Sequence, residues 1–332
     1  MKKQATMRDV AKLAGVTQPT VSYVINNTAH ISEEVRERVT RAIDELNYTP
    51  NYFARGLKTS KSKLVGVVIP DILNEYYAGV VNKLEHMFRL QGFSIVVHST
   101  NYMVDVEKTM LKSLIDYNVE AIVVAYQLIG GASYEILREY RRPVVILEGG
   151  EAGAEFHRIN TDNFYGGYTA AMHLIGQGRR RIAYIGQSGD IEALRERQRG
   201  FMTAVQEQGL EEFSQVLSTS SLINKWEEGV NMGRHLRAYD LDGVVVSSDA
   251  VAIGILKSYL RAGVKIPGDV AIIGYDDIPL AEIIMPGLTT MAQPMEDMCS
   301  VAVDKVVQGL KGDTAVATHT ILKPQLVQRE TS

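Results

Sequence analysis

The stretch TMRDVAKLAGVTQPTVSYVINN, residues 6–27, decides how the chain folds at its start. Thr6 precedes an apolar pattern and an acid follows shortly after it, a pairing that predicts a capped helix. Gly15 is a natural helix end because glycine adopts positive φ without steric cost. Thr17 caps a second helix, and Pro19 falls in its first turn, where its missing N–H is harmless. Two short helices joined by a tight turn are therefore expected.

A third helix is expected directly after these two. Ser32 stands at its start, with Glu33 and Glu34 in the first turn, where acids favour the helix dipole. Apolar residues then recur at helical spacing as far as Leu46. Three short helices with this turn form the helix-turn-helix pattern, whose second helix enters the major groove of DNA. A generic three-helix bundle has the same pattern, so the pattern alone leaves DNA binding open.

Charge is distributed unevenly along the 332 residues, whose net charge is −4. Residues 1–63 contain eleven Lys and Arg against six Asp and Glu, a net charge of +5, so the remainder carries −9. A basic head on an acidic body indicates that only the head meets a polyanion. Chance clustering on a solvated surface is the alternative reading.

Composition places the chain among ordinary globular proteins, with 45% hydrophobic and 22% charged residues. No apolar run is long enough for a membrane span, and the polar start at residues 1–8 lacks the apolar core of a signal peptide. The lone Cys299 cannot form an internal disulfide, and the seven histidines show no metal-ligand spacing. We expect a soluble cytoplasmic protein without a metal or cofactor.

After Lys63 strands and helices alternate, which predicts parallel sheets covered by helices. The pattern predicts strands at 64–69, 94–99, 121–125, 144–147, 181–185, 243–246 and 270–274, and helices at 77–91, 106–117, 165–177, 193–208, 226–237 and 251–262. The rhythm restarts near residue 165, so two lobes with a cleft between them are expected. Ligands bind beyond the carboxyl ends of parallel strands, which makes this cleft the expected binding site.

Three stretches carry a family resemblance: residues 6–27, ISEEVRERVTRAIDELNYTPN (31–51) and ARGLKTSKSKLVGVVIPD (54–71). They strongly resemble the LacI/GalR family of bacterial transcriptional regulators, whose members begin D-V-A-x-x-A-G-V-S-x-x-T-V-S. The match is nearly continuous through Leu57. Looser landmarks of the same family follow in INTDNFYGGYTAAMHLIGQGRRRIAYIG, RQRGF, DGVVVSSDAVAIGILKSYLRAGVKIPGDVAIIGYDD and PGLTTMAQP.

The resemblance implies a sequence-specific DNA-binding regulator, a repressor, acting as a homodimer on a near-palindromic operator. It implies an α/β fold: an N-terminal three-helix helix-turn-helix domain joined to a two-lobed effector domain like the periplasmic binding proteins. We expect the helix-turn-helix domain at 1–49, a hinge helix and linker at 50–63, and the effector-binding and dimerisation domain at 64–332. The N-lobe would comprise about 64–161 and 293–322, and the C-lobe about 162–292 and 323–332.

The same resemblance assigns the DNA contacts. Gln18 is the best reader of a base edge, because its amide pairs bidentately with adenine, whereas Thr20 and Ser22 are expected at phosphates. Tyr23 departs from the arginine common at this position, so the base it faces stays open. The assigned residues are Thr6, Thr17, Gln18, Pro19, Thr20, Ser22, Tyr23, Asn26, Asn51, Ala54, Arg55, Leu57 and Lys58.

The hinge begins after Pro50 and is marginal as a helix, since Gly56 weakens it by about 1 kcal/mol. By resemblance, two hinges fold against each other in the minor groove. Leu57 matches the leucine that opens the central base step and kinks the DNA. The alternative is a linker leucine that packs on its own domain.

Candidate effector contacts follow the predicted strands and the family landmarks. Arg197 carries a fork suited to vicinal hydroxyls, a carboxylate or a purine oxygen, and Asp276 can accept two hydroxyl hydrogen bonds at a strand end. Asp249 is either a helix cap or a ligand contact. The full set is Asp71, Tyr76, Tyr77, Glu148, Arg197, Trp226, Ser248, Asp249 and Asp276.

The effector itself stays open between a sugar, which we favour, a purine-like metabolite and a protein corepressor that docks on the N-lobe. Induction and corepression are equally open. A sugar-binding module whose head merely tethers it is the alternative of a different class. Glu148 and Asp276 resemble a glycosidase carboxylate pair, but nothing sets one as acid and the other as nucleophile, so we expect no enzyme. The short tail after Lys323 lacks the family's tetramerisation helix and favours a dimer.

Overall fold

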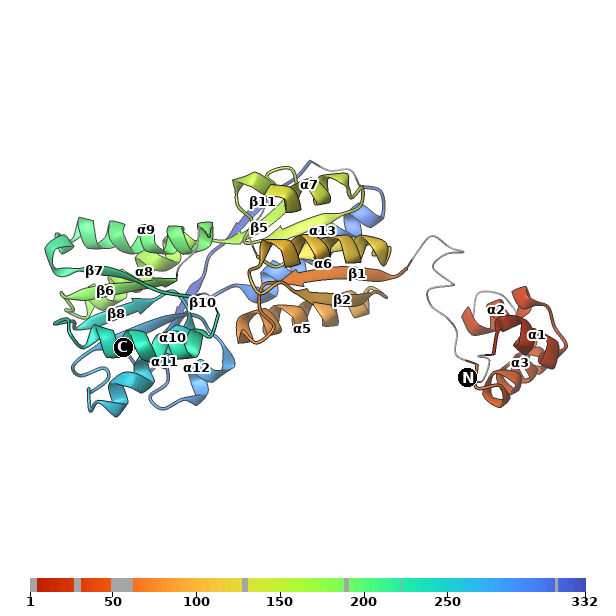
Figure 1. Cartoon of the computed structure of the whole chain (residues 1–332), viewed down its shortest axis with the longest axis horizontal. Coiled ribbons are helices and arrows are strands. Elements are labelled where there is room, and N and C mark those ends of the chain that lie inside the picture. The colour runs from red at the N-terminus through yellow and green to blue at the C-terminus, as the bar shows by residue number, and fades with distance from the viewer. Residues whose placement is uncertain are drawn as a thin grey trace. The chain divides into compact units, whose positions relative to one another are not determined.

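The computed structural model describes residues 5–26, 31–48, 62–126, 131–187, 191–221, 223–313 and 316–332. The chain forms two compact units, Met1–Ser62 and Lys63–Ser332 (Figure 1). Among the described helices, none combines the length and apolarity needed to cross a bilayer.

The N-terminal unit contains the three expected helices, α1 (Met7–Ala14), α2 (Gln18–Asn26) and α3 (Glu33–Glu45). The Thr6 hydroxyl accepts a hydrogen bond from the Asp9 N–H, the Thr6 N–H donates to the Asp9 carboxylate, and Gly15 ends α1 at φ 65°. The core of the unit is small and apolar, built around side chains such as Val10, Val21, Val24, Val39 and Ala42. Capping and apolar spacing thus fix a compact helix-turn-helix.

The larger unit contains two six-stranded sheets with the same order of strands. The first sheet is β2-β1-β3-β4-β5-β11 and the second is β7-β6-β8-β9-β10-β12. Neighbouring strands are parallel except for β10 and β12. The strands are β1 (Leu64–Ile69), β2 (Ser94–Ser99), β3 (Ala121–Val124), β4 (Val144–Leu147), β5 (His157–Thr161), β6 (Ile182–Gln187), β7 (Gln215–Thr219), β8 (Gly243–Val246), β9 (Ala271–Asp276), β10 (Thr289–Ala292), β11 (His319–Leu322) and β12 (Gln325–Val327).

Helices cover both faces of each sheet, which explains why the central strands read as apolar runs rather than alternating patterns. On β1, Val67 faces the α5 and α13 side while Val68 faces the α6 side, and both are fully buried. The helices are α5 (Glu75–Leu90), α6 (Val104–Asp116), α7 (Gly131–Glu139), α8 (Asn163–Gly176), α9 (Glu192–Glu207), α10 (Lys225–Leu236), α11 (Asp249–Arg261), α12 (Pro279–Ile283) and α13 (Met295–Leu310); short 3-10 turns occur at Glu151–Gly153 and Glu211–Phe213.

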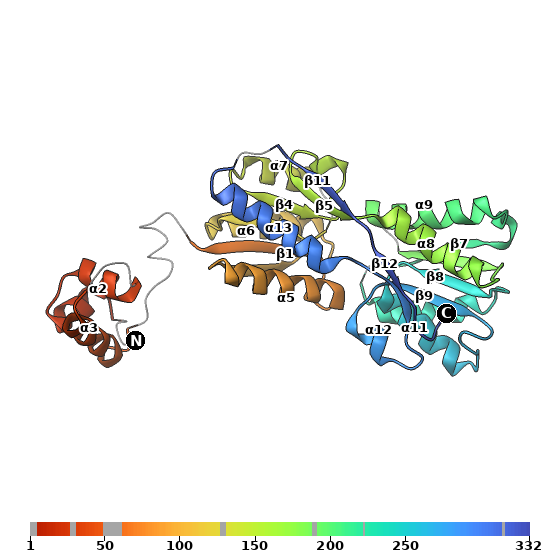
Figure 2. The same ribbon diagram turned by 180° about the vertical axis from the view of Figure 1, so that it is seen from behind.

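The described chain passes between the two lobes at three places: after β5, after β10 and between β11 and β12. Figure 2 shows β11 and β12 running in dark blue from one lobe into the other. The N-lobe sheet therefore holds residues from 64–161 and 319–322, and the C-lobe sheet holds 182–292 and 325–327.

The α/β fold with parallel sheets flanked by helices is confirmed. The predicted helices of the larger unit are present, but each begins one or two residues earlier than the apolar pattern indicated. The apolar pattern did not predict the helices α7, α12 and α13 or the strands β5, β7, β10, β11 and β12. Two of them, β7 and β11, are half exposed and carry no continuous apolar run, which is the signal that revealed the buried strands.

Candidate functional site

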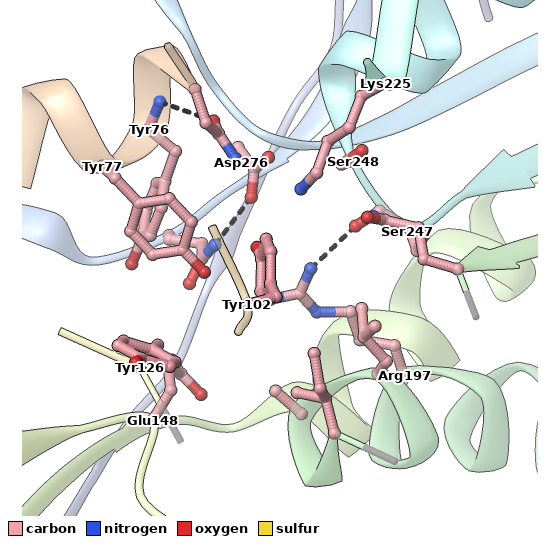
Figure 3. A pocket seen from close by; sticks show the side chains of 16 residues that line it. Tyr76, Tyr77, Tyr102, Tyr126, Glu148, Arg197, Lys225, Ser247, Ser248 and Asp276 are labelled. Carbon is pink, nitrogen blue, oxygen red and sulfur yellow. Dashed lines mark hydrogen bonds between the residues drawn. The ribbon is translucent and has the colours of Figure 1, made fainter. Parts of the chain in front are cut away.

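A cavity of about 60 Å³ lies where the carboxyl ends of strands from both lobes converge (Figure 3). Six of the expected effector contacts line it: Tyr76, Tyr77, Glu148, Arg197, Ser248 and Asp276. Its other lining residues were not singled out from the sequence; the polar ones are Asn74, Tyr102, Tyr126, Gln187, Lys225, Ser247 and Gln293.

Arg197 occupies the C-lobe wall of this cavity and is held rigidly. Its Nε donates to the Asn163 Oδ1 at 2.7 Å and its Nη1 to the Ser247 carbonyl at 2.7 Å. The guanidinium stacks on the Tyr275 ring, 3.6 Å from the centroid. Burial disfavours the charged form, but neighbouring Tyr275, Asp276 and Glu148 outweigh that effect, so the pKa of Arg197 is raised. The arginine is a fixed cation at the cavity wall.

Two glycines set the position of Arg197. A Cβ at Gly167 on α8 would lie 1.9 Å from the Arg197 carbonyl oxygen, and one at Gly200 would lie 2.0 Å from the Phe164 carbonyl oxygen. The backbones of α8 and α9 can approach this closely only because both positions lack a side chain. The landmark around Arg197 and Gly200 is thus a packing requirement as well as a chemical one.

Glu148 links the arginine to the N-lobe through Asn163. It lies just after β4 at φ 53°, a conformation that L-residues rarely adopt. Its two carboxylate oxygens accept from the Thr161 N–H at 2.9 Å and from the Asn163 Nδ2 at 2.8 Å. Because Asn163 also accepts from Arg197, a continuous chain of hydrogen bonds connects the two lobes at the cavity.

Asp276 closes the cavity at the end of β9, with φ 126°. Its Oδ1 accepts from the Gln293 Nε2 at 2.7 Å, and the Gln293 amide oxygen accepts from the Thr161 hydroxyl at 3.1 Å. Burial raises the pKa of Asp276, while the charges of Arg197 and Lys225 lower it. Strained backbone at Glu148 and Asp276 marks a site that the surrounding fold enforces.

Lys225 is the first residue of α10 and the second cation at the cavity. Its side chain is 9% exposed, and within the described part of the chain its ammonium has neither a hydrogen-bond acceptor nor a salt-bridge partner. Burial lowers the pKa of Lys225. In Figure 3 the Lys225 amine points into the space shared with Asp276 and Arg197.

Two further polar atoms at the cavity are unpaired among the described residues: the Ser248 hydroxyl and the Gln187 Oε1. The Gln187 amide nitrogen instead donates to the Ser247 hydroxyl at 3.1 Å. Buried polar atoms without partners also occur elsewhere in the described chain, at His98, Tyr134, Arg158 and Ser214. At a cavity, such atoms indicate a place for a ligand or water.

The N-lobe contributes aromatic rings. Tyr76 and Tyr77 begin α5 and pack edge to face with ring centroids 5.3 Å apart, while Tyr102 and Tyr126 follow β2 and β3. The Tyr126 hydroxyl donates to the buried Glu107 at 2.6 Å. Burial raises the pKa of all four phenols, so they stay neutral.

Three expected effector contacts do not line the cavity. Asp71 accepts from the Leu73 N–H in its own loop, and Trp226 is 36% exposed beside Lys225. The Asp249 carboxylate is buried and accepts from the Thr290 hydroxyl at 2.6 Å and the Ile278 N–H at 3.0 Å. Its function is therefore to hold the loop after β9. Nor does Asp249 cap α11, since Ser248 occupies that position.

Polar side chains also gather where α1 turns into α2. Thr17, Gln18, Pro19 and Tyr23 are exposed, whereas Thr20 and Ser22 are half-buried. The Thr17 hydroxyl accepts from the Thr20 N–H at 3.4 Å and so caps α2 as expected. The Thr6 hydroxyl is engaged with Asp9 at the start of α1.

Part of the expected DNA interface lies outside the described residues, namely Asn51, Ala54, Arg55, Leu57 and Lys58. The backbone of Asn26 is described as the end of α2, but its side chain is not. In the described ranges, no three His, Cys, Asp or Glu side chains come together as a metal site.

The residues missed from the sequence share one position in the fold. Gln187 ends β6, Ser247 follows β8, and Tyr102 and Tyr126 follow β2 and β3. The rule that ligands bind at the carboxyl ends of strands pointed to all of them, but it does not choose among side chains. Lys225 follows a strand, β7, that the sequence analysis had missed.

Comparison with known proteins agrees with both units. Residues 6–51 match the family described as bacterial regulatory proteins, lacI family, and residues 171–332 match the periplasmic binding protein-like domain. The ribose operon repressor of Escherichia coli is 31% identical over 328 residues, covering 98% of this chain and 99% of the relative.

Two solved structures extend the likeness over the whole chain. A cellobiose complex of the transcriptional regulator CelR is 29% identical, with a TM-score of 0.73, and covers 99% of this chain and 100% of its own. The Lac repressor dimer bound to operator and the anti-inducer ONPF shares the fold, with a TM-score of 0.86 at 24% identity and 99% coverage of both chains. The expected resemblance is thus confirmed: this chain belongs to the lacI family of bacterial regulatory proteins and is a DNA-binding transcriptional regulator.

Proposed function

We propose that the protein is a homodimeric repressor whose affinity for a near-palindromic operator is set by a small polyhydroxylated effector bound between the lobes. The hydrogen-bonded chain Glu148–Asn163–Arg197 carries this proposal, because it ties the N-lobe to the C-lobe at the wall of the cavity. A ligand that contacts Arg197 and Asp276 therefore acts on the lobe-to-lobe geometry directly. The effector is bound and not converted.

The physical requirement for such control is a difference in effector affinity between two arrangements of the lobes. The cavity walls come from both lobes, so a change in their separation changes the contacts with the ligand. The three chain crossings near Thr161, Ala292 and Leu322 are the segments that would absorb this motion. The sign of the response, induction or corepression, follows from which arrangement the ligand favours.

A sugar-like effector is supported by the polar chemistry of the cavity. Arg197 and Asp276 supply a donor fork and an acceptor, the pair that holds vicinal hydroxyls, and the N-lobe tyrosines supply apolar ring faces. The CelR structure holds cellobiose in the same fold. These features favour a carbohydrate over a purine. A single titration with both classes of ligand distinguishes the two.

The DNA interface in this proposal is the start of α2. Gln18 and Tyr23 are exposed and available to base edges, while the half-buried Thr20 and Ser22 are assigned to phosphates. Dimerisation through the body places two such helices on matching half-sites. The Lac repressor structure contains a dimer on operator DNA. A protein that regulates transcription in this way works in the bacterial cytoplasm.

Selection of bound sequences from a random DNA pool with the full-length protein tests the DNA half of the proposal. We expect a symmetric pair of half-sites. A collection of unrelated or asymmetric sequences would contradict a dimeric regulator.

A titration with sugars and purines, with operator affinity as the readout, tests the effector half. Trp226 is the only tryptophan; it lies outside the cavity lining but directly follows Lys225, so its fluorescence is a probe of changes at the start of α10. Arg197→Lys should abolish the response, because a lysine cannot form the fork to Asn163 and Ser247. The matched control is Arg199→Lys, two residues along α9 and exposed. If operator affinity responds equally to the effector in Arg197→Lys and Arg199→Lys, the effector does not bind at this cavity.

A further inference from the structure

The two cations of the cavity are not fully used by the protein. The Nε and Nη1 of Arg197 donate to Asn163 and Ser247, while its Nη2 has no hydrogen-bond acceptor in the described chain. The Lys225 ammonium is 9% exposed and unpaired among those same residues. Figure 3 shows both groups directed at the same space. The two N–H bonds of Nη2 and the three of the ammonium, five in all, thus lie at the same cavity without an acceptor among the described residues.

Helix ends reinforce this positive side. The residues that precede or begin α5, α9, α10 and α11 line the cavity, namely Asn74, Ile191, Lys225 and Ser248. The N-terminus of a helix carries partial positive charge and favours an anion. For α9, α10 and α11 no side chain caps that end, so their first N–H groups have no local side-chain acceptor.

A neutral sugar in this cavity would displace the water that the Lys225 ammonium faces and would supply no opposite charge in its place. Removing a charge from water is costly unless an opposite charge or several acceptors replace the lost hydration. Asp276 acts on Lys225 through space, but within the described chain neither it nor Glu148 forms a hydrogen bond or an ion pair with the ammonium: Glu148 accepts from Thr161 and Asn163, and Asp276 from Gln293. A ligand that brings its own negative charge supplies the missing partner for Lys225.

The size of the cavity limits the ligand. One water position needs about 10–15 Å³ of such space. The 60 Å³ therefore corresponds to about four to six water molecules. That is the volume of one sugar ring with its substituents, and a disaccharide does not fit without further separation of the lobes.

We propose that the effector is a monosaccharide-sized sugar acid whose acid group lies between Lys225 and Arg197 and whose hydroxyls meet Asp276, Gln187 and Ser248. This inference rests on the proposed effector site and names its ligand class. A carboxylate fits better than a phosphate ester, because Glu148 and Asp276 line the same cavity and a dianion would face both. The shared chemistry is an anionic group on a polyhydroxylated carbon skeleton.

Matched pairs of probes test the charge requirement on the full-length protein. The pairs are D-glucuronate with D-glucose, D-galacturonate with D-galactose, and D-gluconate with sorbitol; D-glucose 6-phosphate tests the phosphate ester. Binding is measured by Trp226 fluorescence and thermal shift. We expect at least one acid to bind about tenfold or more tightly than its neutral partner. Binding of the phosphate ester alone would overturn the carboxylate assignment.

Lys225→Met removes the charge and keeps the length of the side chain. We expect the preference for the acid to disappear, and the melting temperature of the ligand-free variant to rise, because the unpaired ammonium is no longer buried. A merely structural lysine would lower the melting temperature when replaced. The matched control is Lys257→Met on α11, where the lysine is exposed, and it should leave both properties unchanged.

The outcomes separate this inference from the proposed function. A neutral sugar that binds equally well to the parent and to Lys225→Met, but not to Arg197→Lys, overturns the acid and leaves the effector site standing. Failure of every acid in the panel to bind also overturns the inference. If the acid still binds to Arg197→Lys, its site lies outside the cavity. That result would contradict both the proposed effector site and the sugar-acid inference.

Discussion

Exposed polar side chains at the start of α2 and buried polar side chains at the cavity are the two binding surfaces of the proposed function, and they lie in opposite physical environments. Gln18 and Tyr23 lie on the surface of the N-terminal unit and take no part in its core. Arg197 and Asp276 are nine-tenths buried and hydrogen-bonded to their surroundings. A substitution at the start of α2 can therefore change binding without changing stability. A substitution at the cavity is expected to change both.

Arg197→Ala is the most severe test of this comparison, because the buried network is expected to support the fold of the body. The change removes two charge-assisted hydrogen bonds and the stacking on Tyr275. We expect a loss of about 4 kcal/mol in the free energy of unfolding of the body. Chemical denaturation of the full chain, compared with Arg199→Ala, measures it. A loss as small as that of the control would show that the buried network contributes nothing to the fold.

Asp249→Asn tests the buried carboxylate behind the cavity. Burial and the neighbouring Asp276 raise the pKa of Asp249 to about 8, above its ordinary value of 3.8. The folded protein therefore keeps a proton that the unfolded chain releases, and stability falls as the pH rises from about 4 to about 8. The asparagine can still accept from Ile278 and donate to Thr290, so its stability should not fall in this way.

The measurement for Asp249 is urea denaturation across this pH range. The free energy of unfolding of Asp249→Asn relative to the parent should increase by about 1.4 kcal/mol for each pH unit. Asp304→Asn, at an exposed position on α13, is the control and should run parallel to the parent. Parallel curves for Asp249→Asn as well would mean that the carboxyl ionises normally in the folded protein.

Gln18→Ala should weaken binding to the selected operator by about 1–3 kcal/mol and leave the melting temperature unchanged. The reason is that the proposed role of the amide is to read a base edge, and the exposed side chain is not part of the core. Fluorescence anisotropy with operator and with random DNA separates the two contributions. An equal loss on both DNAs would assign Gln18 to the phosphate backbone.

Thr6→Ala is expected to have the smallest effect. It removes the hydroxyl half of the capping box of α1 and should cost about 1 kcal/mol in the stability of the N-terminal unit. Hydrogen exchange of the α1 amides measures the loss locally. An unchanged exchange rate would show that Asp9 alone supports the helix start.

Local patterns were sufficient for the N-terminal unit. The caps Thr6 and Thr17, the stop at Gly15 and the apolar spacing act over a few residues, so they can be read along the sequence. The α/β alternation of the body could be predicted in the same way. Arg197 and Asp276 were chosen from family landmarks and a strand end, and both line the cavity. Their sequence spacing did not show that Arg197 and Asp276 lie close together in space.

Asp249 and Lys225 show what could not be predicted from the sequence. Both are charged residues at the start of a helix; the sequence offered Asp249 as either a helix cap or a ligand contact and did not single out Lys225. In the fold Asp249 is neither, because Thr290 and Ile278 donate to it, whereas no described side chain forms a hydrogen bond with the Lys225 ammonium, which lines the cavity. Only the packing of segments distant in sequence decides which charge is satisfied.

What the sequence determined by itself is the three N-terminal helices and the alternation of strands and helices in the body, since capping and apolar periodicity are local properties of the chain; α13 and the buried strand β10 were not predicted. The tertiary structure alone decided which side chains meet at the cavity and which of them still lack partners. Tyr76, Arg197 and Gln293 are far apart along the chain and are brought together by strand order and lobe crossings. Electrostatic and hydrogen-bond energies depend on distances in space, and these are set by the packed fold.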